Sequence, residues 1–124
     1  MEPLYIEATE ETPEVKLDPA QNIFSISGRS LPEDSVAFYQ PIFAWIESFT
    51  AEATQDIDFE FFMEYFNTSS SKQIVKILVL LEKLNENVFT QVIWKYHSDD
   101  TDMMESGLRF SKLLDIEFEL REVE

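Results

Sequence analysis

The stretch from Ile57 to Leu84 places a strand pattern and a helix pattern on either side of a run of hydroxyl side chains. Up to Phe66 the residues alternate with period two, which is the pattern of a half-buried strand. The last part carries apolar residues at three- and four-residue intervals, which is the pattern of a helix packed on a core. The alternation predicts two opposite strand faces, the first formed by Ile57, Phe59, Phe61, Met63 and Tyr65, and the second by Asp58, Glu60, Phe62, Glu64 and Phe66.

Four consecutive hydroxyl residues, Thr68 to Ser71, follow Asn67 at the junction between this strand and this helix. The first turn of a helix leaves backbone N–H groups unpaired and carries partial positive charge, so it stabilises a nearby anion. The run therefore has two interpretations. The more common one is a helix cap, because serine and threonine oxygens accept hydrogen bonds from those N–H groups. The other is a phosphorylation switch, which we take as the central hypothesis.

The composition is that of a folded protein with a substantial core. With 124 residues the chain is expected to form a single domain, 1–124, and its 44% hydrophobic content includes 11 phenylalanines. The absence of cysteine excludes disulfides and thiolate metal sites. The first residues lack the pattern of a signal peptide, and the longest apolar run, Ile77–Leu81, is too short to span a membrane. We therefore expect a cytoplasmic protein.

The chain is strongly acidic. Nine lysines and arginines oppose 25 aspartates and glutamates, which gives a formal net charge of −16. Such a surface repels nucleic acid and anionic lipid, so we expect neither nucleic acid nor a membrane as a partner. The charge favours a protein partner with a basic patch. Solubility alone is the simpler explanation of the same acidity.

The periodicities along the chain predict the element order ββαβαβαβ, an α/β fold. The predicted elements are strands 15–17 and 23–27, a helix over 33–53, the central strand and helix, a strand over 90–97, a helix over 102–114 and a strand over 116–121. The acidic residues 1–14 contain two prolines, and both an extended arm and a short strand at Leu4–Ile6 fit them.

Strands separated by helices pair in parallel through right-handed crossovers, whereas the first two strands are close enough to form an antiparallel hairpin. The strands alternate rather than being apolar throughout, so we predict an open, mixed sheet with helices mainly on one face. Phe62, Phe66 and Ile93 would then lie on the uncovered face. An exposed apolar patch of this kind is typical of an interface, and a homodimer through it is one prediction.

No catalytic or metal-binding constellation stands out in the sequence. The single histidine, His97, precedes Asp99–Asp102, but the spacing matches no calcium loop, and Asp102 is well placed as a helix cap. The two glycines, Gly28 and Gly107, are too few for a glycine-rich nucleotide loop. We therefore expect no enzyme activity, no metal and no cofactor, and keep an enzyme that uses His97 as an alternative.

Two further expectations concern the predicted helices. The helix over 33–53 carries two apolar stripes, so it is buried on two sides or contacts a partner. A small-ligand carrier, with an apolar pocket between Trp45, Phe49 and the sheet, is the second candidate function. The last helix is expected to bury the residues that recur at three- and four-residue intervals on one side, which are Met104, Leu108, Ser111 and Leu114.

Two lysines lie close to the hydroxyl run. Lys72 and Lys76 are four residues apart on the predicted helix, where cations in the first turns oppose the helix dipole slightly. A phosphate on Thr68 would find helix N–H groups and Lys72 within reach. An ordinary solvated lysine pair is the alternative interpretation.

Three groups of short segments are recognisable as family motifs. They are TPEV (Thr12–Val15) with Leu17–Asp18, ISGRSLPEDS (Ile26–Ser35) with Phe38–Tyr39 and Pro41–Ile42, and NTSSSK (Asn67–Lys72). In these segments, which lie between Thr12 and Lys72, the sequence resembles the SiaC family of bacterial regulatory phosphoproteins. The fold of that family is similar to the STAS domain of anti-sigma-factor antagonists, which implies a mixed sheet of four to five strands packed by helices.

The resemblance also implies a function and a site. It implies a phosphorylated threonine in the NTSS motif, which is Thr68, with Ser69 as the alternative because STAS antagonists are modified on a serine at the start of the same helix. The unmodified protein is expected to bind and activate a diguanylate cyclase in cyclic-di-GMP and biofilm control. A dedicated kinase and a PP2C-like phosphatase would set its state. The candidate partner-binding residues are Asn67, Thr68, Ser69, Ser70, Lys72, Lys76 and Arg29.

Overall fold

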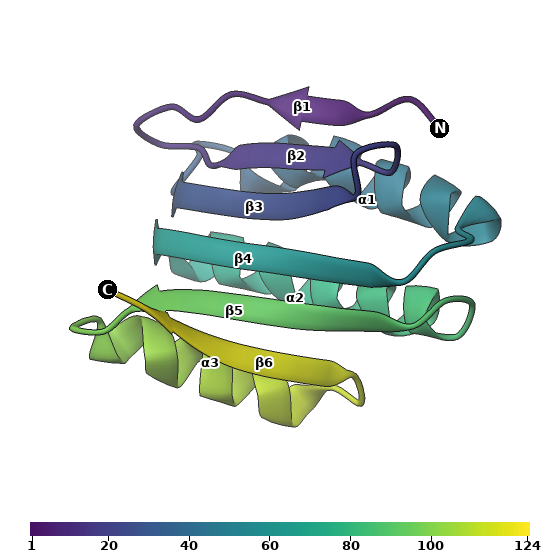
Figure 1. Cartoon of the computed structure of the whole chain (residues 1–124). Coiled ribbons are helices and arrows are strands. Elements are labelled where there is room, and N and C mark those ends of the chain that lie inside the picture. Colours follow the sequence, from purple (N-terminus) through teal and green to yellow (C-terminus); the bar gives the residue numbers. More distant parts are fainter.

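Strands and helices alternate along most of the chain, and the computed structural model describes all residues, 1–124. The strands are β1 (Leu4–Ile6), β2 (Glu14–Asp18), β3 (Ile23–Ser30), β4 (Ile57–Phe66), β5 (Thr90–His97) and β6 (Glu117–Val123). The helices are α1 (Ser35–Glu52), α2 (Thr68–Asn85) and α3 (Thr101–Leu113). Each helix connects two neighbouring strands of one sheet (Figure 1).

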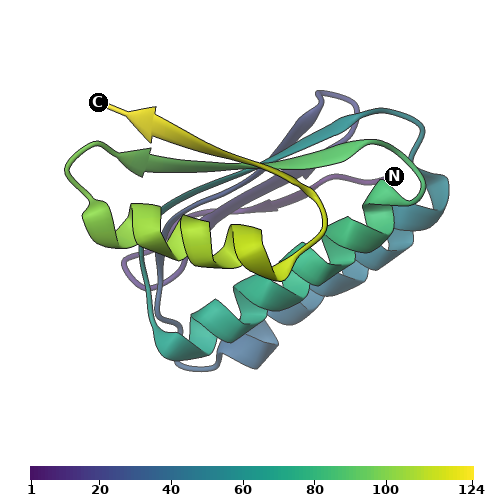
Figure 2. The same cartoon turned by 90° about the horizontal axis from the view of Figure 1, so that it is seen from below.

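The six strands lie in the sheet in the order in which they occur in the sequence. The pairs β1–β2 and β2–β3 are antiparallel, and the pairs from β3 to β6 are parallel. Because each crossover moves one strand further in the same direction with the same hand, all three helices lie on one face of the sheet (Figure 2). The predicted α/β fold with a mixed sheet covered mainly on one face is therefore confirmed.

The sheet is larger than predicted because the first residues form a strand. Leu4 pairs with Leu17 and Ile6 with Val15 along the free edge of β2. Leu4 and Ile6 are partly buried and pack against the core, so pairing removes their apolar surface from water. The extended-arm interpretation is wrong for these residues, and the sheet has six strands rather than four to five.

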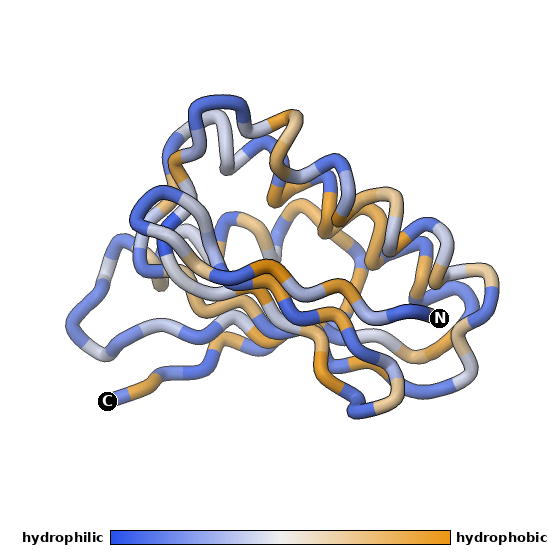
Figure 3. Tube along the Cα trace, turned by 90° about the horizontal axis from the view of Figure 1, so that it is seen from above, coloured by the Kyte–Doolittle hydropathy of each residue, from blue (hydrophilic) through white to orange (hydrophobic).

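The core fills the layer between the sheet and the helices. A cluster of 24 buried apolar residues occupies this layer, and its largest fully buried side chains are those of Trp94, Tyr39, Phe59 and Phe61. Apolar and polar residues alternate along the strands and recur along the helices (Figure 3), so each element presents one apolar face to the core. None of the three helices is long and apolar enough to cross a membrane.

A bulge near the end of β4 changes which side chains reach the core. Gly28 of β3 pairs with Met63 and Arg29 pairs with Tyr65, so Glu64 is the extra residue. After it the alternation is inverted. Tyr65 is 44% exposed on the uncovered face, whereas Phe66 turns to the helices and its ring lies 6.0 Å from that of Phe110. The predicted faces are therefore wrong for Tyr65 and Phe66.

The predicted apolar patch on the uncovered face is also wrong. Phe66 belongs to the other face, and Ile93 is only 3% exposed, flanked by Glu60 of β4 and Glu119 of β6 in the ladder. Phe62 is half-buried, with the ring of His97 5.0 Å from its own. Polar and charged side chains thus cover most of this face, and the homodimer prediction loses the surface on which it rested.

The helix α3 begins one residue earlier than predicted and buries a different set of residues. Asp100, not Asp102, is the N-cap, and its side chain accepts the N–H of Met103 at 3.0 Å. Gly107 faces the sheet and lets the helix approach Trp94 and Leu120 closely. The buried residues of α3 are therefore Met103, Ser106, Gly107 and Phe110 rather than Met104, Leu108, Ser111 and Leu114.

Candidate functional site at the start of α2

Asn67 is the cap of α2. Its side-chain oxygen accepts the N–H of Ser70 at 2.8 Å, and its carbonyl oxygen accepts the N–H of Ser71 at 2.9 Å. Its own N–H donates to the carbonyl oxygen of Ser30 at 3.1 Å, which fixes the end of β4 against the end of β3. Because the asparagine supplies the cap, capping does not explain the hydroxyl run that follows it.

Ser69 and Ser70 are each engaged in a side-chain hydrogen bond. The Ser69 hydroxyl is hydrogen-bonded to that of Ser35, the first residue of α1. The buried Ser70 hydroxyl accepts a hydrogen bond from Ser30 at 2.8 Å, and Ser30 is in turn hydrogen-bonded to the Tyr39 hydroxyl at 2.7 Å. Burial raises the pKa of Tyr39, so this phenol stays protonated. These two serines therefore join α2 to β3 and α1.

Thr68 differs from both serines. It is the first residue of α2, its side chain is exposed, and its hydroxyl has no hydrogen-bond partner in the chain. The backbone N–H groups of Thr68 and Ser69 are also unpaired, since the cap satisfies those of Ser70 and Ser71. An exposed hydroxyl thus lies beside two free donors at the positive end of the helix dipole.

The structure brings Lys72 near this site but not Arg29. Lys72 is exposed one turn along α2 from Thr68, and four residues place two side chains on the same side of a helix. Lys76 is one further turn away. Arg29 instead lies on the uncovered face of the sheet, over the ring of Tyr65 at 5.5 Å and 3.7 Å from a carboxylate oxygen of Glu64. Arg29 is therefore not part of a cluster with Thr68.

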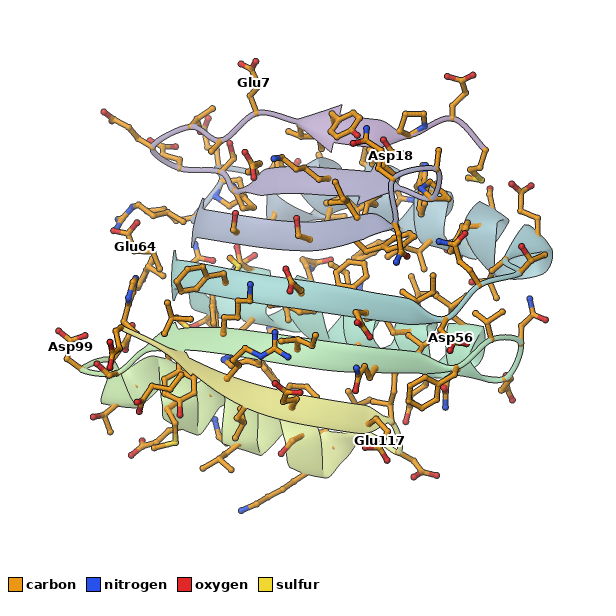
Figure 4. All side chains as sticks on the ribbon, viewed as in Figure 1. Glu7, Asp18, Asp56, Glu64, Asp99 and Glu117 are labelled. Carbon is orange, nitrogen blue, oxygen red and sulfur yellow. The ribbon has the colours of Figure 1, made fainter.

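The alternative sites do not assemble. His97 packs on Phe62, Asp100 caps α3, and no three histidine, aspartate or glutamate side chains converge on a point that could hold a metal. The labelled carboxylates in Figure 4, from Glu7 to Glu117, lie scattered around the sheet rather than in one cluster.

The predicted ligand pocket beside Trp45 and Phe49 is filled by the rings themselves. Trp45 and Phe49 stack with their centroids 5.0 Å apart, and Phe24 of β3 lies 5.5 Å from Phe49. None of the five surface hollows is lined by either residue of that pair. The prediction of a carrier pocket here is wrong, because aromatic side chains occupy the space that a ligand would need.

The serines that hold the site in place were not found from the sequence. Ser30 and Ser35 lie more than thirty residues before their partners on α2, and no local periodicity shows such a pairing. Both lie in the segment ISGRSLPEDS, which carries part of the family resemblance. That segment was the only signal that could have pointed to them.

The fold and the site together define a class of protein: a small α/β protein with a one-sided mixed sheet and an unpartnered threonine exposed at the start of a helix. Comparison with known proteins shows the family. The profile described as SiaC family regulatory phosphoprotein matches residues 6–123. The chain therefore belongs to the SiaC family.

Similar proteins come from Pseudomonas aeruginosa. An uncharacterized protein of strain UCBPP-PA14 is 33% identical over 86 residues, which are 69% of this chain and 68% of that protein. The structure of SiaC has a TM-score of 0.88 at 27% identity, and the match covers 99% of this chain and 100% of SiaC. SiaC in complex with the diguanylate cyclase SiaD, of which it is the activator, has a TM-score of 0.90 at 26% identity over 97% of this chain and 99% of that one.

Proposed function

We propose that this chain is a non-enzymatic, cytoplasmic regulator that binds a diguanylate cyclase, and that phosphorylation of Thr68 controls the binding. A protein kinase and a PP2C-like phosphatase would set the state of Thr68 and so link it to cyclic-di-GMP and biofilm control. Membership of the SiaC family supports the choice of partner. The observation that carries the choice of residue is the exposed, unpartnered hydroxyl of Thr68 beside two free N–H groups.

The proposed mechanism is electrostatic. A phosphoryl group adds about −1.5 to −2 charges at neutral pH. At Thr68 the helix N–H groups and Lys72 are placed to receive it, so the fold needs no rearrangement. Lys72 offsets only part of this charge, and burying the remainder in an interface costs several kcal/mol, which is enough to abolish a micromolar contact. The modified protein therefore releases a partner that docks over the start of α2.

The geometry favours Thr68 over Ser69 as the modified residue. Modification of Ser69 would break its hydrogen bond to Ser35 and separate the starts of α1 and α2, whereas modification of Thr68 breaks no hydrogen bond. Phosphopeptide mass spectrometry of the protein purified from its own cells checks this choice. We expect phosphate on Thr68, and phosphate on Ser69 alone would contradict it.

Thr68→Glu, compared with Thr101→Glu, tests the switch. Both threonines are exposed first residues of a helix capped by the preceding side chain, so the two variants carry the same charge change at the same helix position. The settings differ in charge, because Thr101 lies between Asp100 and Asp102. We expect Thr68→Glu to weaken binding of the cyclase about tenfold or more, and Thr101→Glu to bind like the wild type.

Thermal unfolding supplies the control, since a carboxylate in the first turn of a helix changes stability by only about 0.3–1 kcal/mol. If Thr68→Glu keeps the melting temperature and still binds the cyclase as tightly as Thr101→Glu does, the switch proposal is wrong.

A further inference from the structure

A groove runs between α1 and α2 on the side of the helices that faces away from the sheet. One hollow of about 340 Å³ is lined from α1 by Gln40, Phe43 and Glu47, and from α2 by Val75, Lys76, Val79 and Leu80. A second hollow of about 220 Å³ follows it and is lined by Glu47, Thr50, Leu80 and Lys83. The shared residues Glu47 and Leu80 make the two hollows one continuous groove along the helix pair.

The α2 side of this groove is basic, although the protein is acidic. α2 contains three lysines, Lys72, Lys76 and Lys83, and a single acidic residue, Glu82. These are three of only nine basic residues in a chain with a net charge of −16. None of the three lysines forms an ion pair within the chain, unlike Lys16 and Lys95. The residues that line the groove include two of these lysines, Lys76 and Lys83, and one acidic residue, Glu47 of α1. The lining is therefore weakly positive on an acidic molecule, and its positive charge lies on the α2 side.

The same surface exposes apolar side chains between its lysines. Val79 is 41% exposed, and Val75 and Leu80 are half-buried beside it. Helices expose no free backbone edge, so a partner must be held here by side chains. An amphipathic helix in a groove of this kind places apolar side chains in the hollows and polar side chains on the rim.

We propose that this groove binds an acidic amphipathic helix of the partner, with aliphatic side chains in the larger, more apolar hollow and carboxylates on Lys76 and Lys83. The proposal rests on the proposed function, because it identifies the docking surface for the same partner. Charge complementarity favours an acidic helix of another protein over a helix of a second copy of this chain, because α2 is basic, α3 carries as many basic as acidic residues, and α1 itself lines the groove.

The groove explains why a phosphate on Thr68 acts on binding. Thr68, Lys72 and Val79 lie on one side of α2, since their spacings of four and seven residues bring them to the same face. A phosphate on Thr68 pairs with Lys72 and places a dianion at the end of the groove. An acidic partner helix is then repelled, whereas a basic one would be attracted.

Matched charge reversals test the proposal with the cyclase that the wild-type protein binds. The groove variant is Lys76→Glu with Lys83→Glu, and the control is Lys16→Glu with Lys112→Glu. All four lysines are solvent-accessible, the net charge changes equally, and Lys83 and Lys112 both lie in the last turn of a helix. We expect the groove variant to bind at least about tenfold more weakly, and the control to bind within about threefold of the wild type.

A zero-length carbodiimide cross-link locates the contact directly. The reagent joins a lysine amine to a carboxylate only where the two touch, so we expect peptides that link Lys76 or Lys83 to an aspartate or glutamate of the cyclase. Cross-links from Lys16, Lys95 or Lys112 alone would overturn the groove proposal, as would links to a second copy of this chain.

The outcomes separate the two proposals. If the wild-type protein binds no cyclase, the proposed function fails and the groove proposal fails with it. If the cyclase binds and is released by Thr68→Glu, but the groove variant binds as its control does, the groove proposal alone is wrong.

Discussion

Asn67 and Thr68 are adjacent residues with different roles at the start of α2. The side chain of Asn67 holds the helix start by accepting the N–H of Ser70, so Thr68 is free of any structural hydrogen bond. A residue that can be modified without loss of stability must be exposed and unpartnered, and Thr68 meets both conditions. The sequence shows the hydroxyl run, but it does not show which hydroxyl is both exposed and unpartnered, because the partners Ser30 and Ser35 are distant in the chain.

Asp18 is a second residue whose environment has a measurable consequence. The hydroxyl of Tyr5 donates to its carboxylate, and the side chain of Gln21 donates to it at 2.9 Å. These hydrogen bonds, the one from Tyr5 first, lower the pKa of Asp18 below its ordinary value of 3.8, although burial acts in the opposite direction. The bond also joins β1 to the end of β2, so the ionised carboxylate helps to hold the edge strand.

A change of Tyr5→Phe should therefore destabilise the protein in a pH-dependent way. A carboxyl group with a lowered pKa contributes stability above its unfolded pKa, and that contribution disappears as the pH falls through the folded pKa. We expect the difference in free energy of unfolding between the wild type and Tyr5→Phe to be constant above about pH 5 and to shrink below pH 3.8.

Urea unfolding at several pH values measures this difference, and Tyr65→Phe serves as the control, because the exposed Tyr65 hydroxyl has no hydrogen-bond partner. A difference for Tyr5→Phe that stays constant down to pH 2 would show that Asp18 is not the cause.

At the scale of elements, α3 approaches the sheet so closely at position 107 that only glycine fits there without strain. A Cβ atom on Gly107 would overlap Cδ1 of Trp94 and lie 2.6 Å from Cδ2 of Leu120. Trp94 is fully buried and donates its indole N–H to the carbonyl oxygen of Met103 at 3.0 Å, so it cannot move aside freely. The glycine therefore sets the distance between α3 and the pair β5–β6.

Gly107→Ala should destabilise the protein by about 1–2 kcal/mol. The contacts with Trp94 and Leu120 are close enough to put the overpacking cost in the upper part of the usual range of about 1–3 kcal/mol, and replacing glycine within a helix returns about 1 kcal/mol of it. Chemical denaturation measures the change, and Glu105→Ala, on the exposed side of the same helix, should stay within about 0.5 kcal/mol of the wild type. A stabilised Gly107→Ala protein would mean that α3 is free to shift.

Elements with a long regular period were predictable, and the exceptions have physical causes. The strand of β4 and the buried face of α2 follow directly from their spacing. The bulge at Glu64 inserts one residue into β4, so Tyr65 and Phe66 lie on the opposite faces of the sheet from those predicted. In α3 the small residues Ser106 and Gly107 face the sheet, where a search for apolar side chains does not find them. The strand β1 is only three residues long and depends on its pairing with β2.

At the scale of the whole molecule, a one-sided sheet leaves two surfaces of different character. The uncovered face is crossed by charged side chains such as Lys95 and Glu60, which form an ion pair at 3.3 Å. The helical side carries Thr68, the lysines of α2 and the groove beside α1. The net charge of −16 predicts a basic partner, but it cannot show that the local charge of the groove has the opposite sign. That sign depends on which residues α2 turns outward.

The measurement that tests the central claim most directly is the affinity of the cyclase for the natively purified protein before and after removal of its phosphate. Mass spectrometry first establishes the phosphate on Thr68, and titration calorimetry then compares the two forms at the same pH and salt concentration. We predict that the dephosphorylated protein binds at least about tenfold more tightly, since the interface no longer buries a dianion. Equal affinity of the two forms, with Thr68 fully phosphorylated in one of them, would contradict the account.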